Sequence, residues 1–168
     1  MSNPMRELKI EKITLNIGAG DDKQKVEKAV KLLEMLTEKK AVVTLSKKRS
    51  TFGVPKGKPL GAMVTLRKKD AEEFLKKTFV AKENKISLDQ IDSSGNFSFG
   101  IKEYIDIPGV RYSHDIGMSG FDIAVTVERK GFRIKRRRIK KTKIPEKQKI
   151  SKEETAEWLK NKFGVEVI

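Results

Sequence analysis

The chain has 168 residues, of which 37% are hydrophobic and 36% charged, and its formal net charge is +15. This length suits one domain, or one domain with an appendage. The lack of cysteine excludes disulfides and Cys-ligated metals, and no stretch approaches the ~20 apolar residues that span a bilayer. The N-terminal stretch also lacks the apolar segment of a signal peptide, so we expect a cytoplasmic protein that does not bind membranes.

Two basic islands hold the excess positive charge. Residues 47–58 carry five Lys or Arg and no acid, and residues 129–150 carry twelve against the single acid Glu146. Outside the first island, residues 1–128 are electrically balanced. Positive charge concentrated in this way indicates a polyanionic partner, most simply a nucleic acid.

In chain order, the first half predicts a strand at residues 12–17, a helix opened by Asp21 and Asp22, and strands at 41–46 and 62–67. The strands show apolar residues at every second position. Asp70 and Glu73 resemble the cap and reciprocal partner of a second helix. The expected apolar sides of the two helices are Val26, Val30, Leu33 and Leu36, then Ala71, Phe74, Leu75, Thr78 and Phe79.

The second half predicts strands at residues 97–102 and 121–128, again from strict alternation. Beyond the second basic island, Ser151 and Glu154 form a capping-box pattern for a last helix. We expect residues 1–128 to form one domain, 129–150 a basic arm, and 151–168 a helix that packs back on the domain.

The five strands predict a sheet with helices on one face and a polar opposite face. The outward residues of this polar face are Lys12, Thr14, Asn16, Thr44, Ser46, Thr65, Arg67, Ser98 and Lys102. Composition alone leaves two interpretations open, an ordinary solvated face or an RNA-binding face. The basic islands favour RNA.

The two islands are the other candidate contacts. The loop at residues 47–60 combines cations, glycines and an aromatic residue, which suits contact with phosphates and bases: Lys47, Lys48, Arg49, Phe52, Lys56 and Lys58. The arm could be a disordered tail or a membrane-surface helix, but an extended arm or hairpin on a phosphate backbone fits best. Its candidate cations are Arg133, Lys135, Arg136, Arg137, Arg138, Lys140 and Lys141.

Nothing in the sequence argues for catalysis, a metal or a cofactor. Gly18-Ala19-Gly20 follows a strand, but the third glycine of a dinucleotide fingerprint is replaced by Lys23. His114 is the single histidine, and neither a serine elbow nor metal-ligand spacing accompanies it.

Three segments carry a family resemblance: KITLNIGAG (12–20), KPLGAMVTLR (58–67) and GNFSFGIKEYIDIPG (95–109). They resemble the large-subunit ribosomal protein L-five family, which binds 5S rRNA, over roughly residues 6–128. The shortened N-terminus and the basic C-terminal tail resemble its archaeal and eukaryotic branch. The resemblance implies an α+β fold, in which a twisted antiparallel sheet carries helices on one face and leaves a polar face open to RNA.

The resemblance also implies partners. Asn16 and Thr65 match family positions that touch 5S rRNA in the central protuberance, and Phe52 matches an aromatic of the loop that reaches peptidyl-site tRNA. Further implied partners are large-subunit rRNA and neighbouring proteins, including a small-subunit bridge protein. Where the family usually has Gly-Gln after the first helix, this chain has Glu38-Lys39. The alternative hypothesis is a basic protein–protein interaction module that uses the sheet edge and lacks specific RNA recognition.

Overall fold

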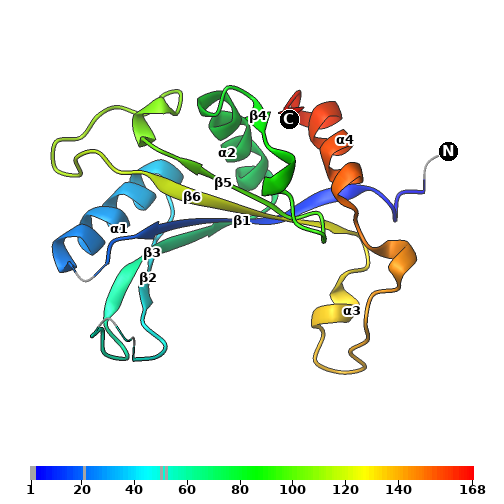
Figure 1. The fold of residues 1–168 in the computed structure, drawn as a ribbon, viewed down its shortest axis with the longest axis horizontal. Coiled ribbons are helices and arrows are strands. Elements are labelled where there is room, and N and C mark those ends of the chain that lie inside the picture. The colour runs from blue at the N-terminus through cyan, green and yellow to red at the C-terminus, as the bar shows by residue number, and fades with distance from the viewer. Residues whose placement is uncertain (1–2, 21, 50, 52) are drawn as a thin grey trace. The chain divides into compact units, whose positions relative to one another are not determined.

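The structure, a computed structural model, describes residues 3–20, 22–49, 51 and 53–168. Its five-stranded sheet has the order β2-β3-β1-β6-β5 (Figure 1). The strands are β1 (Leu8–Gly18), β2 (Val42–Leu45), β3 (Pro59–Leu66), β5 (Phe97–Ile101) and β6 (Phe121–Arg129). The helices are α1 (Lys23–Thr37), α2 (Lys68–Ala81), α3 (Arg133–Arg136) and α4 (Lys152–Phe163). The predicted α+β fold is confirmed.

The chain forms two compact units, each built from several segments. Unit 1 contains residues 1–13, 67–98 and 125–168, and unit 2 contains residues 14–66 and 99–124. Unit 1 includes a second, two-stranded sheet in which β4 (Lys85–Ile86) runs parallel to β7 (Glu166–Val167). No helix in the described part of the chain is both long and apolar enough to cross a membrane.

Helix α1 packs against β3 in unit 2. Its apolar side buries Val26 and Leu33, as the helical spacing predicted, together with Ala29 and Leu32. The carboxylate of Asp22 accepts a hydrogen bond from the Gln24 amide at 2.9 Å, which caps the first turn. Asp21, the other predicted helix-opening acid, lies outside the described residues.

Helices α2 and α4 form the apolar centre of unit 1 together with the start of β5. The predicted stripe of α2 is buried in full. The ring of Phe79 stacks on Phe97, with centroids 6.3 Å apart, and meets Phe163 of α4 edge-on at 5.4 Å. Ser151 and Glu154 form the predicted capping box of α4.

Two local predictions need correction. Helix α2 begins at Lys68, with Arg67 before it and no side-chain cap, so Asp70 is not the cap residue. The physical reason is that Arg67 alone separates β3 from α2, which leaves Asp70 in the first turn, where a negative charge still suits the helix dipole. The arm, which was predicted to be an extended arm or a hairpin, also contains the single helical turn α3 at residues 133–136, which neither form includes.

Candidate nucleic-acid interface

The polar sheet face of unit 2 has the side chains that alternation predicted. Asn16 of β1 and Thr65 of β3 are exposed, as is Lys102 just after β5, while Thr14 and Thr44 are half-buried. Asn16 and Thr65 make no side-chain hydrogen bond with any residue that the structure describes. Strands β2 and β3 are paired in a register that places Thr44 opposite Gly61. This register fixes the positions of the polar side chains of the two strands relative to one another.

The polar residues of unit 1 lie in a different electrostatic setting. Lys12 is half-buried, and Arg67 and Ser98 are exposed, as predicted. Arg67, however, pairs with Glu11 at 3.3 Å, and the Glu11 side chain is only 10% exposed. Arg67 therefore already has an anionic partner within the protein.

A compact ion-pair network surrounds two acids that sequence reasoning missed. Glu11 of β1 and Glu128 of β6 both pair with Arg136 of the arm. Lys9 also contacts Glu128, at 3.4 Å. The side chains of Glu11 and Glu128 are 10% and 13% exposed, whereas their cationic partners are about half exposed, so salt screens these pairs less than it would fully exposed ones. Arg136 therefore fixes the arm to the sheet, and an RNA phosphate would have to compete with two carboxylates for it.

The arm is anchored at both ends within unit 1. At its start, Arg129 is buried, and its guanidinium donates hydrogen bonds to both oxygens of Glu154 at 2.7 Å. At its end, Ile150 is buried and Ser151 begins the cap of α4. Between these anchors, Arg137 donates to the Lys140 carbonyl at 2.7 Å. The other predicted arm cations, Arg133, Lys135, Arg138, Lys140 and Lys141, are exposed.

The basic loop of unit 2 has a closed base and exposed charges. The Ser46 amide donates to the Lys58 carbonyl at 2.8 Å, and the Gly57 amide donates to the Ser46 carbonyl at 2.9 Å. The cations Lys47, Lys48, Arg49 and Lys56 are exposed and Lys58 is half-buried. Phe52, the predicted stacking residue, lies outside the described residues. The loop thus presents several charges from a stem that β2 and β3 hold in place.

Glu38, at a position where the family usually has glycine, has a left-handed backbone conformation. Glu38 follows the last residue of α1 with φ of 54°, which is the left-handed conformation that glycine adopts most readily. Its amide donates to the Glu34 carbonyl at 2.8 Å and closes the helix. A glycine at this position therefore serves the backbone conformation.

The described residues hold no candidate metal centre. No group of three or more His, Asp or Glu side chains that could hold a metal occurs among them, and His114 is exposed. What the two units present is an assembly of exposed cations, hydroxyls and amides. Such groups bind phosphate oxygens, riboses and base edges.

Comparisons with known proteins agree with this chemistry. A family model described as "Ribosomal protein L5" matches residues 3–54, and a second model, which describes the C-terminus of the same ribosomal protein family, matches residues 59–158. The chain is 48% identical over 168 residues to the large ribosomal subunit protein uL5 of Sulfurisphaera tokodaii, covering 99% of this chain and 95% of the relative. The uL5 protein of Thermoplasma acidophilum is 46% identical over 168 residues, covering 99% of each chain.

Proposed function

We propose that this chain, which belongs to the ribosomal protein L5 family, binds 5S rRNA through the polar face of its sheet. As a member of that family it is a structural, non-enzymatic component of the large ribosomal subunit and works on the ribosome in the cytoplasm. The observation that carries the 5S rRNA proposal is the exposure of Asn16 and Thr65 on the neighbouring strands β1 and β3. An amide and a hydroxyl in this position can bond to riboses and base edges in the shallow groove of folded RNA.

The basic segments supply affinity for other RNA. We infer that the arm lies on large-subunit rRNA through its exposed cations, and that Arg136 contributes mainly by holding the arm in place. The loop at residues 47–60 would reach peptidyl-site tRNA, with support from its exposed charges and its closed base. Exposed cations add affinity by releasing counterions from phosphates, largely without regard to sequence.

A protein contact is supported by one further observation. Strand β2 is at the edge of the sheet order, and its apolar side chains Val42, Val43 and Leu45 are 57%, 40% and 57% exposed. An exposed apolar edge favours pairing with another chain. This edge is a candidate contact for a neighbouring ribosomal protein, including the bridge protein of the small subunit. If the protein stayed associated with ribosomes after nuclease treatment, this edge would be assigned to a protein contact and not to an RNA contact.

The 5S rRNA proposal is tested by binding at several salt concentrations. The double variant N16A/T65A loses two hydrogen bonds worth about 1 kcal/mol each, so its affinity for 5S rRNA should fall about 30-fold. The dependence of its affinity on salt should stay as in the parent, because no charge is removed. The matched control is N161A, which removes an exposed amide from α4. Parent-like affinity of N16A/T65A would refute the proposal.

The arm and the loop are tested separately. The salt slope is the decrease in the logarithm of the binding constant per unit increase in the logarithm of the salt concentration. Charge reversal in the arm, R133E/K135E/R138E, should lower this slope by about two to three for binding to a large-subunit rRNA fragment. Removing charge from the loop, K47Q/K48Q/R49Q, should weaken the protection of peptidyl-site tRNA in reconstituted ribosomes without changing 5S rRNA binding. An unchanged tRNA footprint would exclude the loop from that contact.

A further inference from the structure

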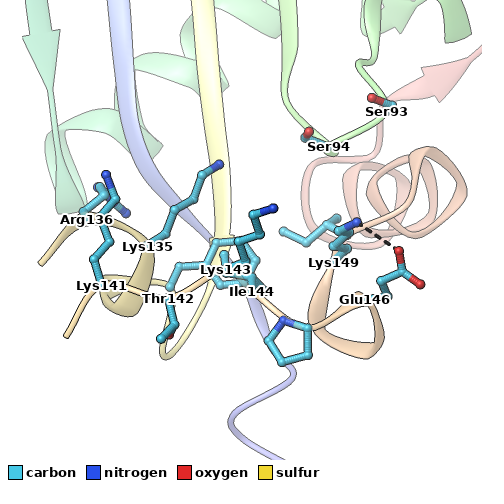
Figure 2. A pocket seen from close by; sticks show the side chains of 13 residues that line it. Ser93, Ser94, Lys135, Arg136, Lys141, Thr142, Lys143, Ile144, Glu146 and Lys149 are labelled. Atoms are coloured by element: carbon cyan, nitrogen blue, oxygen red, sulfur yellow. Dashed lines mark hydrogen bonds and ion pairs between the residues drawn. The ribbon is translucent and has the colours of Figure 1, made fainter.

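A basic groove lies in unit 1 between the arm and the turn that precedes β5. Its volume is about 1220 Å³, above the roughly 300–1,000 Å³ typical of small-molecule sites. The arm contributes most of its lining, and Figure 2 shows Ser93 and Ser94 across from the arm. In Figure 2 the ammonium groups of Lys135 and Lys143 extend toward the side on which these serines lie. The size and openness suit a segment of a polymer better than a small molecule.

The charge of the groove calls for an anion. Five cations line the groove, and two of them are already paired with acids of the protein. Arg136 pairs with Glu11 and Glu128. Lys149 lies 3.4 Å from Glu146. The other three, Lys135, Lys141 and Lys143, form no ion pair with any residue that the structure describes. These three lysines line an open groove, and phosphates are the anions that a protein of the ribosome meets most often.

The groove also has an apolar lining that a double helix would leave unused. Phe132, Ile144 and Ile150 contribute to it, with Ile150 buried and the other two half-buried. The outer surface of a duplex offers phosphates and riboses, and its paired bases are stacked on one another. An unpaired base, in contrast, can stack on an aromatic ring while its phosphates meet cations.

We propose that this groove binds an unpaired segment of rRNA. The phosphates lie at Lys135, Lys141 and Lys143, one base packs against Phe132, and the hydroxyls of Ser94 and Thr142 meet a ribose or base edge. The proposal rests on the proposed function of the chain as an rRNA-binding protein. The groove would make the arm prefer single-stranded RNA to duplex RNA. The number of cations in the arm does not predict such a preference.

The test measures fluorescence anisotropy of an eight-nucleotide oligouridylate and of a twelve-base-pair RNA duplex with the full chain. F132L keeps apolar bulk but removes the ring, so it should bind the oligouridylate about tenfold more weakly and leave duplex affinity within about twofold. K135Q/K141Q/K143Q should lower the salt slope for the oligouridylate by about two. The control K76Q/K77Q/K160Q removes the same charge from exposed positions on α2 and α4 and should change that slope by less than about one-half.

Two results would overturn the proposal. One is an oligouridylate affinity of both groove variants equal to that of the control. The other comes from competition with polyglutamate of equal length. If polyglutamate displaced the labelled oligouridylate at the same concentration as unlabelled oligouridylate does, the groove would be assigned to an acidic protein. Far-UV circular dichroism checks the folding of F132L, and if this variant unfolds, the lysine variant decides alone. Binding of 5S rRNA by N16A/T65A is a separate readout, so failure of the groove and failure of the proposed function are distinguishable.

Discussion

The substitution Gly95→Ala tests how the turn before β5 is joined to α4. Gly95 is buried and has φ of +75°, a conformation that costs a residue with a side chain about 1 kcal/mol. A Cβ atom there would lie 2.5 Å from Cγ2 of Ile150 and 2.7 Å from Oγ1 of Thr155. Both neighbours are buried, at 2% and 0% exposure, so neither can move away cheaply.

The expected cost follows from these two effects. Overpacking a well-packed interior typically costs 1–3 kcal/mol, so together with the backbone strain the loss of stability is about 3 kcal/mol. For a chain of this length each kcal/mol lowers the melting temperature by about 2–4 °C, so G95A should melt roughly 6–12 °C below the parent.

Two other glycines separate the two effects. Gly164 has φ of +67° with nothing within 4 Å of an added Cβ, so G164A should show the strain alone, about 1 kcal/mol. Gly18 has an equally open surrounding and no positive φ, so G18A should stay within about 0.5 kcal/mol of the parent. Thermal and urea unfolding followed by circular dichroism measure all three variants. If G95A were no less stable than G164A, the close packing of the turn against Ile150 and Thr155 would be refuted.

Three further variants test other contacts by the same unfolding measurements. E38G should stabilise the chain by about 0.5–1 kcal/mol, because glycine relieves the left-handed backbone at the end of α1; a loss of stability would show that the Glu38 side chain matters more than the strain. E154Q leaves the guanidinium of Arg129, 7% exposed, without its anion and should cost about 1–2 kcal/mol, less than for a fully buried pair because Glu154 is 46% exposed. A parent-like midpoint would mean that water replaces the carboxylate. T155V removes the hydroxyl that donates to the Gly95 carbonyl at 3.2 Å and should cost about 1–2 kcal/mol; no change would indicate that this carbonyl finds another donor.

The sequence predicts the regular elements of this chain well, because their signals are local. Side chains of a strand alternate between its faces, so the buried and exposed positions of β3, β5 and β6 follow directly from the pattern. The prediction of β1 starts too late, at residue 12 in place of Leu8. Glu11 and Lys12 are both half-buried, which interrupts the alternation between the buried residues Ile10 and Ile13. Strands β4 and β7 have two residues each, which is too short for any period.

The sequence predicts which side chains make up the candidate interface. It does not predict which of them form ion pairs within the protein. The exposed amide and hydroxyl at Asn16 and Thr65 follow from strand alternation. The engagement of Arg136 does not, because Glu11 is 125 residues away in the chain. A count of cations therefore overstates what the arm offers to RNA. The groove depends in the same way on long-range packing, since Ser93 and Ser94 join it from a turn that the sequence places far from the arm.

The double anchoring of the arm bears on how this part of the chain can change. Arg129 and Arg136 fix its start, and Ile150 with the cap of α4 fixes its end. With both ends fixed, doubling the length of the segment between them would cost only about 0.6 kcal/mol in loop-closure entropy. Insertions at residues 137–140, which do not line the groove, can therefore lengthen the arm at little expense to the sheet. This stretch is the natural place to splice a longer segment or a reporter.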